Sequence, residues 1–81
     1  MEEKILLILK DVNEDILSYT GNNMMADGVI DSFELIEIVG RLEEDFDMEI
    51  DGEYVVAQNF GNKESIISLM EKLLSKTGGA E

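Results

Sequence analysis

The sequence predicts an all-α fold, a small bundle of three or four helices with a long first loop. Apolar side chains recur at helical spacing, every three or four residues, in the segments 2–19, 32–46 and 63–76. The chain of 81 residues contains no proline and no internal repeat, and its length suits one domain. We therefore expect a single domain over residues 1–76, followed by a disordered tail over residues 77–81.

The first helix is expected over residues 2–19. Its buried stripe is expected to consist of Ile5, Leu9, Val12 and Ile16, widened by Leu6 and Leu17. Gly21 follows the last turn and is the expected C-terminal cap, because glycine readily adopts the left-handed conformation that ends many helices.

Residues 20–31 form a long connection with two kinds of residue. Its turn formers are Gly21, Asn22, Asn23 and Gly28, and its apolar residues are Met24, Met25, Val29 and Ile30. A connection of this length is usually functional or disordered. Because of the apolar residues, we expect the loop to pack on the bundle.

The second helix is expected over residues 32–46. Asp31 and Glu34 match the D-x-x-E form of a capping box, which predicts that the helix begins at Ser32. On a helical wheel the core stripe consists of Leu35, Ile38, Leu42 and Phe46. The opposite, water-facing side consists of Phe33, Glu37, Gly40 and Glu44. Ser32 stands where free N–H groups and the helix dipole favour a negative group such as phosphate.

The segment 47–62 is expected to be irregular, with one helical turn over residues 54–57. Asn62 is the expected N-cap of the last helix, over residues 63–76. The core stripe of that helix is expected to consist of Ile66, Met70, Leu73 and Leu74.

The charge of the chain excludes several function classes. The net charge is −13, from 19 acids and 6 bases, so a nucleic-acid binder or a protein of anionic membrane surfaces is not expected. Between Asp31 and Asp51 there are nine acids and one base, Arg41. A field this one-sided attracts basic partners and raises their association rates. With no signal peptide, no apolar run of membrane-spanning length and no cysteine, a cytoplasmic monomer is expected.

The second predicted helix carries a family resemblance. The residues D-S-F at 31–33, Glu37-Ile38, and L-E-x-x-F from Leu42 to Phe46 resemble those of acyl and peptidyl (aminoacyl) carrier proteins. The resemblance extends from about Ile5 to Leu74, which is nearly the whole chain. It implies that Ser32, by its motif position, carries a covalent 4′-phosphopantetheine and that Asp31 helps to seat the modifying enzyme.

The resemblance also implies the mechanism and partners of a free-standing carrier. A phosphopantetheinyl transferase would modify Ser32, and the arm would present acyl or aminoacyl thioesters to loading and condensing enzymes with basic docking patches. The residues expected to contact these partners are Phe33, Glu34, Glu37, Gly40, Glu43 and Glu44. Gly40 departs from the larger apolar residue that is usual there. An apolar groove between Ile36, Val39 and the 20–31 loop is expected to shelter the cargo. Fatty-acid, polyketide, aminoacyl and D-alanyl carriers share this format.

Catalysis by this chain itself is not expected. A nucleophilic Ser32 needs a neighbouring base, and the chain has no histidine and no cysteine. Arg41 lies about 13 Å further along the same helix and stays protonated. Lys10 belongs to another helix. Ser32 is therefore interpreted as the substrate of another enzyme.

Two other function classes stay open. The segment Asn23–Glu34 matches the second half of a calcium-binding EF-hand loop, but its third position is Met25, which is not an oxygen ligand. A second partial loop, Asp47–Gln58, lacks the final glutamate. We expect no tight calcium site, only weak divalent-ion binding. The other alternative is an acidic adaptor domain without a prosthetic group.

Overall fold

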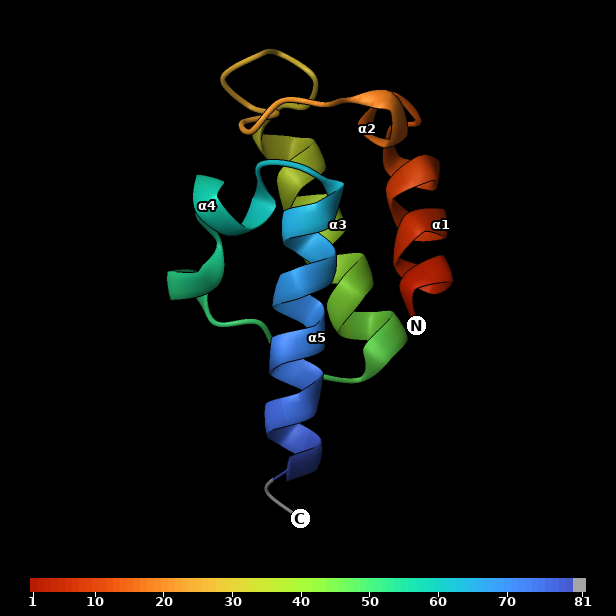
Figure 1. Cartoon of the computed structure of the whole chain (residues 1–81), viewed down its shortest axis with the longest axis vertical. Coiled ribbons are helices and arrows are strands. Elements are labelled where there is room, and N and C mark those ends of the chain that lie inside the picture. Colours follow the sequence, from red (N-terminus) through yellow and green to blue (C-terminus); the bar gives the residue numbers. More distant parts are fainter. Residues whose placement is uncertain (80–81) are drawn as a thin grey trace.

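The computed structural model describes the backbone of residues 1–79 and the side chains of residues 1–75, and its described part is helical without strands (Figure 1). The elements are α1 (Glu2–Val12), α2 (Asp15–Ser18), α3 (Ser32–Phe46), η1 (Gly52–Tyr54), α4 (Ala57–Phe60) and α5 (Lys63–Gly79). This arrangement confirms the predicted small all-α bundle of three main helices, to which the structure adds short helical turns.

α1 and α3 pack against each other in antiparallel directions, and α5 contacts α1 (Figure 1). Near the start of α1, Lys4 Nζ donates a hydrogen bond to the Asp45 carbonyl oxygen at 2.8 Å. Further along the pair, Arg41 Nη1 lies 3.1 Å from Asp11 Oδ2. From Lys4 to Asp11 along α1, the partner on α3 moves back from Asp45 to Arg41, as antiparallel packing requires.

The core is entirely apolar in the described part of the chain, where no polar or charged side chain is buried. Its residues are Ile5, Ile8, Leu9, Ile16, Met24, Ile30, Ile38, Leu42, Ile50, Phe60, Ile66, Leu69, Met70 and Leu73. All three predicted stripes are buried or half-buried, and the main addition from α1 is Ile8. The helices are therefore held mainly by apolar burial along these stripes.

The predicted single helix over residues 2–19 is wrong, because the chain breaks after Val12. Asn13 has extended backbone angles, φ −164° and ψ 107°. Its side-chain oxygen accepts a hydrogen bond from the Asp15 N–H at 3.0 Å. This local bond competes with the helical backbone pattern and starts the separate helix α2.

The predicted cap at Gly21 is also wrong. α2 ends at Ser18, and its C-cap residue is Tyr19 in an extended conformation. Glycine is needed at position 21 for space, because a Cβ atom there would collide with the Tyr19 hydroxyl. The absence of a side chain at Gly21 lets the Tyr19 ring lie across the start of the loop.

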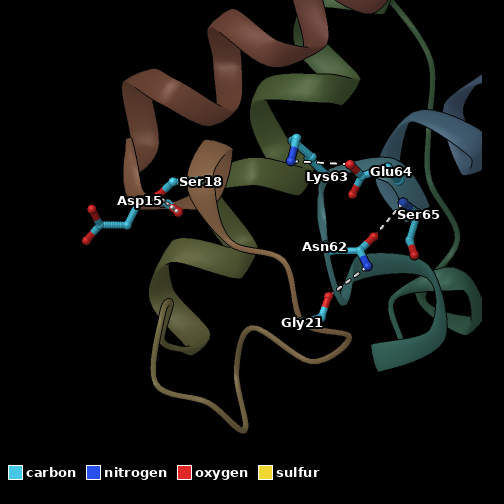
Figure 2. A network of polar contacts seen from close by, with 7 residues as sticks. All are labelled: Asp15, Ser18, Gly21, Asn62, Lys63, Glu64 and Ser65. Atoms are coloured by element: carbon cyan, nitrogen blue, oxygen red, sulfur yellow. Dashed lines mark hydrogen bonds and ion pairs between the residues drawn. The ribbon is translucent and has the colours of Figure 1, made fainter.

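The 20–31 loop packs on the bundle as predicted. Met24 is fully buried and Ile30 is 4% exposed, although Met25 faces solvent. The Met24 N–H donates to the Gly61 carbonyl oxygen at 3.0 Å, and Asn62 Nδ2 donates to the Gly21 carbonyl oxygen at 2.9 Å (Figure 2). The loop is thus pinned to the junction between α4 and α5.

The helical turn predicted over residues 54–57 is wrong in position. η1 ends at Tyr54, and Val56 is extended before α4 begins at Ala57. Valine favours extended backbone because its branched side chain crowds a helix. The buried side chain of Phe60 anchors α4 instead.

The beginning of the last helix is as predicted, and its end is not. Asn62 Oδ1 accepts a hydrogen bond from the Ser65 N–H at 2.8 Å, which confirms the N-cap (Figure 2). α5 continues to Gly79, beyond the expected end at residue 76. Residues 80–81 of the expected tail lie outside the described residues. Within the described part of the chain, none of the helices combines the length and the apolar composition that crossing a bilayer requires.

Candidate functional site

The start of α3 is closed by the predicted capping box. Asp31 Oδ1 accepts a hydrogen bond from the Glu34 N–H at 2.9 Å. In return, Glu34 Oε1 accepts from the Asp31 N–H at 3.2 Å. These two bonds confirm Asp31 as the N-cap and place Ser32 at the first helical position.

Ser32 itself is left free by this arrangement. Its side chain is exposed, and within the described chain its hydroxyl makes no hydrogen bond. The N–H groups of Ser32 and Phe33 also have no acceptor there, as the geometry of a helix N-terminus requires. A phosphate ester on the Ser32 oxygen would meet these donors and the positive end of the helix dipole. The residues present therefore fit a phosphopantetheine attached through a phosphodiester.

One side of α3 faces water as predicted, and we call it the outer face. It consists of Phe33, Ile36, Glu37, Gly40 and Glu44. Phe33 is 82% exposed and Ile36 is 68% exposed, so two large apolar side chains stand among the carboxylates. Ile36 was not expected on this face, although it neighbours Phe33 on the helical wheel. Apart from the adjacent residues and the backbone of α3 itself, no atom lies within 4 Å of the Cβ position of Gly40, so the middle of the face is open.

Glu34 and Glu43, which were expected to contact partners, make hydrogen bonds inside the molecule. Glu34 belongs to the capping box. Glu43 is half-buried, and its Oε2 accepts a hydrogen bond from the Ile50 N–H at 2.7 Å. Glu43 thereby holds the turn after α3 against the helix. These bonds set both glutamates apart from the outer face, whose two carboxylates make no bond within the described chain.

Arg41 is turned away from the outer face by its ion pair with Asp11 on α1, at 3.1 Å. It is the one base between Asp31 and Asp51. Its pairing on the α1 side leaves the outer face with acidic charges only. The electrostatic field around Ser32 is therefore negative where a partner would approach.

Two hydrogen bonds of the Tyr19 hydroxyl hold the loop before Ser32, and we call this pair of bonds the clasp. The Tyr19 hydroxyl donates a hydrogen bond to Asp27 Oδ2 at 2.5 Å and accepts one from the Asn23 N–H at 2.9 Å. The bond to Asp27, with desolvation, raises the pKa of Tyr19 above its usual value. Tyr19 thus closes the loop across eight residues.

A small cavity of about 120 Å³ lies between the loop, α3 and the segment before α5. Its lining residues are Asn23, Met25, Leu35, Val55, Val56, Ala57 and Phe60. The expected groove between Ile36, Val39 and the loop is wrong in its lining, because Leu35 is the residue of α3 that borders the cavity. Leu35 is one helical turn from Ser32, so the cavity lies near this serine.

The carboxylates of the segment Asn23–Glu34 are used for other contacts. Asp27 accepts from Tyr19, and Asp31 and Glu34 form the capping box. Among the described residues, no group of three or more acidic, histidine or cysteine side chains is placed to hold a metal ion.

Comparisons with known proteins add no identification, since no family model, curated protein or solved structure matches the chain. The functional interpretation therefore depends on the start of α3 and its outer face.

Proposed function

We propose that this chain is a carrier protein that holds acyl or aminoacyl groups as thioesters on a 4′-phosphopantetheine attached to Ser32. The observation that carries the proposal is the Ser32 hydroxyl, exposed and without a partner in the described chain, at the first position of a capped helix. When bound, the prosthetic group supplies a thiol on a long flexible arm. The chain supplies a fixed anchor and a high local concentration of cargo.

The residues around Ser32 prepare it as an acceptor. The capping box fixes the backbone on both sides of the serine, and the free N–H groups of Ser32 and Phe33 favour the negative charge of the product. In the transfer, the Ser32 oxygen bonds to phosphorus as the pyrophosphate bridge of coenzyme A breaks and adenosine 3′,5′-bisphosphate leaves. The chain has no histidine, and the carboxylates of Asp31 and Glu34 are bonded in the capping box, so we assign the base that takes the Ser32 proton to the transferase.

The outer face supports the same function as a docking surface. Its exposed aromatic ring and carboxylates fit a partner with an apolar pocket surrounded by basic side chains. Long-range attraction would speed encounter, and burial of Phe33 would hold the complex together.

Transfer to Ser32 is tested directly by mass spectrometry. Incubation with coenzyme A and a broad-specificity transferase should add one phosphopantetheine to the wild-type chain. Ser32→Ala should abolish the addition with nearly unchanged circular dichroism, because the cap is made by Asp31. Ser68→Ala, at an exposed serine on α5, should be modified like wild type. Addition to the Ser32→Ala variant would refute the assignment. The absence of addition to wild type and to every variant would also refute it.

A further inference from the structure

Asn13 joins three separate segments of the molecule at the start of α3. Its Nδ2 donates to the Val29 carbonyl oxygen at 2.8 Å, in the loop, and to Glu34 Oε2 at 3.3 Å, in the first turn of α3. Its Oδ1 accepts from the Asp15 N–H at the start of α2, at 3.0 Å. The side chain is half-buried, so these bonds are partly shielded from water.

The bond to Glu34 continues toward Ser32 through the capping box. Glu34 accepts from Asn13 with one carboxylate oxygen and from the Asp31 N–H with the other. Asp31 in turn accepts from the Glu34 N–H. A continuous series of hydrogen bonds therefore runs from the end of α1 to Glu34, two residues after the serine, and to Asp31, directly before it. Ser32 has no side-chain bond of its own in the described chain, so its direction depends on this series.

We propose that Asn13 is a positioning residue for Ser32: it sets the direction in which the first turn of α3 presents the hydroxyl to a modifying enzyme. The inference deepens the proposed carrier function and depends on it for its kinetic consequence. The outer face docks the partner, whereas Asn13 aligns the acceptor atom. Loss of Asn13 should therefore lower kcat of transfer with little change in KM, because misalignment slows the chemical step in a complex that still forms.

The chemistry of an amide explains why asparagine stands at this position. The side chain must donate to a carbonyl and a carboxylate and also accept from an N–H group, and an amide does all three. Asn13→Asp keeps the acceptor and the shape but loses both donated bonds. It also places a second carboxylate against Glu34, which repels it.

A double variant restores the bond between positions 13 and 34, although the bond to the Val29 carbonyl oxygen stays lost. In Asn13→Asp/Glu34→Gln, the new amide donates to the new carboxylate, and its carbonyl oxygen still accepts from the Asp31 N–H. Asn59→Asp is the matched control, because Asn59 Nδ2 donates to the Tyr54 carbonyl oxygen at 3.0 Å in a half-buried position on α4. It removes a similar bond at a place with no hydrogen-bonded path to Ser32.

The kinetic experiment measures transfer from coenzyme A at a temperature where melting curves show every variant folded. Asn13→Asp should lower kcat about tenfold and change KM less than about twofold. The double variant should recover most of the loss, and Asn59→Asp should match wild type. An unchanged kcat in folded Asn13→Asp, an equal loss in Asn59→Asp, or no recovery in the double variant would overturn the proposal.

Amide hydrogen exchange gives a readout that does not depend on the transferase. Asn13→Asp should speed exchange at the N–H groups of Glu34 and Leu35, both bonded to Asp31, by about tenfold, while α5 stays protected. If wild type accepts no phosphopantetheine, the carrier function fails, and exchange alone decides whether Asn13 orders this turn. Unchanged exchange at Glu34 and Leu35 would overturn the role of Asn13 in either case.

Discussion

Tyr19 shows how a single side chain holds the loop that leads to Ser32. Its hydroxyl is both donor and acceptor, and its ring occupies the space that Gly21 leaves open. The donated bond to Asp27 is the main cause of the raised pKa of Tyr19. Ionisation would remove that hydrogen and place a phenolate beside a carboxylate, so the clasp requires the protonated form.

The clasp therefore predicts a loss of stability at high pH. The folded pKa of Tyr19 lies above the unfolded value of about 10, so its contribution is fully present below that pH. The contribution should be lost as pH rises through the folded pKa. Denaturant midpoints measured between about pH 8 and 11 should fall more steeply for wild type than for Tyr19→Phe. Tyr54→Phe, at a hydroxyl without a hydrogen bond in the described chain, is the control. Parallel profiles for wild type and Tyr19→Phe would contradict the clasp.

α3 combines two functions on opposite sides of one helix. Its inner side supplies Ile38 and Leu42 to the core, and its outer face presents Phe33 and two free carboxylates to solvent. Because Glu37 and Glu44 make no bond within the described chain, changes there should spare the fold. The outer face is therefore open to tests that leave the bundle intact.

Charge reversal on the outer face should slow modification of Ser32 in a salt-dependent way. Glu37→Lys/Glu44→Lys should lower the transfer rate at low salt, and the gap to wild type should narrow as salt rises, because screening weakens steering. Melting temperature should hold or rise, since self-repulsion of the acidic chain falls. The control Glu3→Lys/Glu71→Lys changes the net charge equally at exposed positions on α1 and α5.

Phe33→Ala tests the apolar part of the same face. The substitution should weaken the contact between the outer face and the transferase at all salt concentrations, because the lost contribution is buried apolar area. The measurement is the transfer rate across a salt series for wild type, Glu37→Lys/Glu44→Lys and Phe33→Ala. Melting curves of the same proteins show whether each is folded. An unchanged low-salt rate in the double reversal would show that Glu37 and Glu44 serve solubility and have no docking role.

At the scale of the whole molecule, the loop and the α4–α5 junction approach each other without an intervening side chain. A Cβ atom at Gly61 would collide with the backbone carbonyl oxygens of Asn22 and Ala57. Gly61 has ordinary right-handed backbone angles, which any residue can adopt. Glycine is therefore needed at this position because a side chain would not fit, and not because of its conformational freedom. The docking of the loop thus depends on a glycine in a different part of the chain.

Two alanine substitutions should have opposite effects for this reason. Gly61→Ala should destabilise the protein by about 1–3 kcal/mol, because backbone atoms must move apart. Gly40→Ala should stabilise it by about 1 kcal/mol, because Gly40 lies within α3 and its Cβ position is open. Chemical denaturation measures the free energy of unfolding of both variants. A stable Gly61→Ala variant would contradict the close approach of the loop.

The sequence by itself determined the features that depend on neighbouring residues. The capping box at Asp31 and Glu34, the bounds of α3, the N-cap at Asn62 and the apolar stripes all follow from spacings of three or four residues. The exposure of Phe33 follows from the same periodicity. These local patterns need no knowledge of the rest of the chain, so they could be predicted.

Only the tertiary structure decided the features whose partners lie far along the chain. Asn13 ends α1 and contacts Glu34, 21 residues away, and Asn62 holds Gly21, 41 residues away. Arg41 is drawn to Asp11 on another helix, away from the outer face. The lining of the cavity depends in the same way on how the loop and the segment 55–60 meet α3. A sequence pattern records which residues can bond or bury themselves, whereas packing of the helices determines which distant partners they meet.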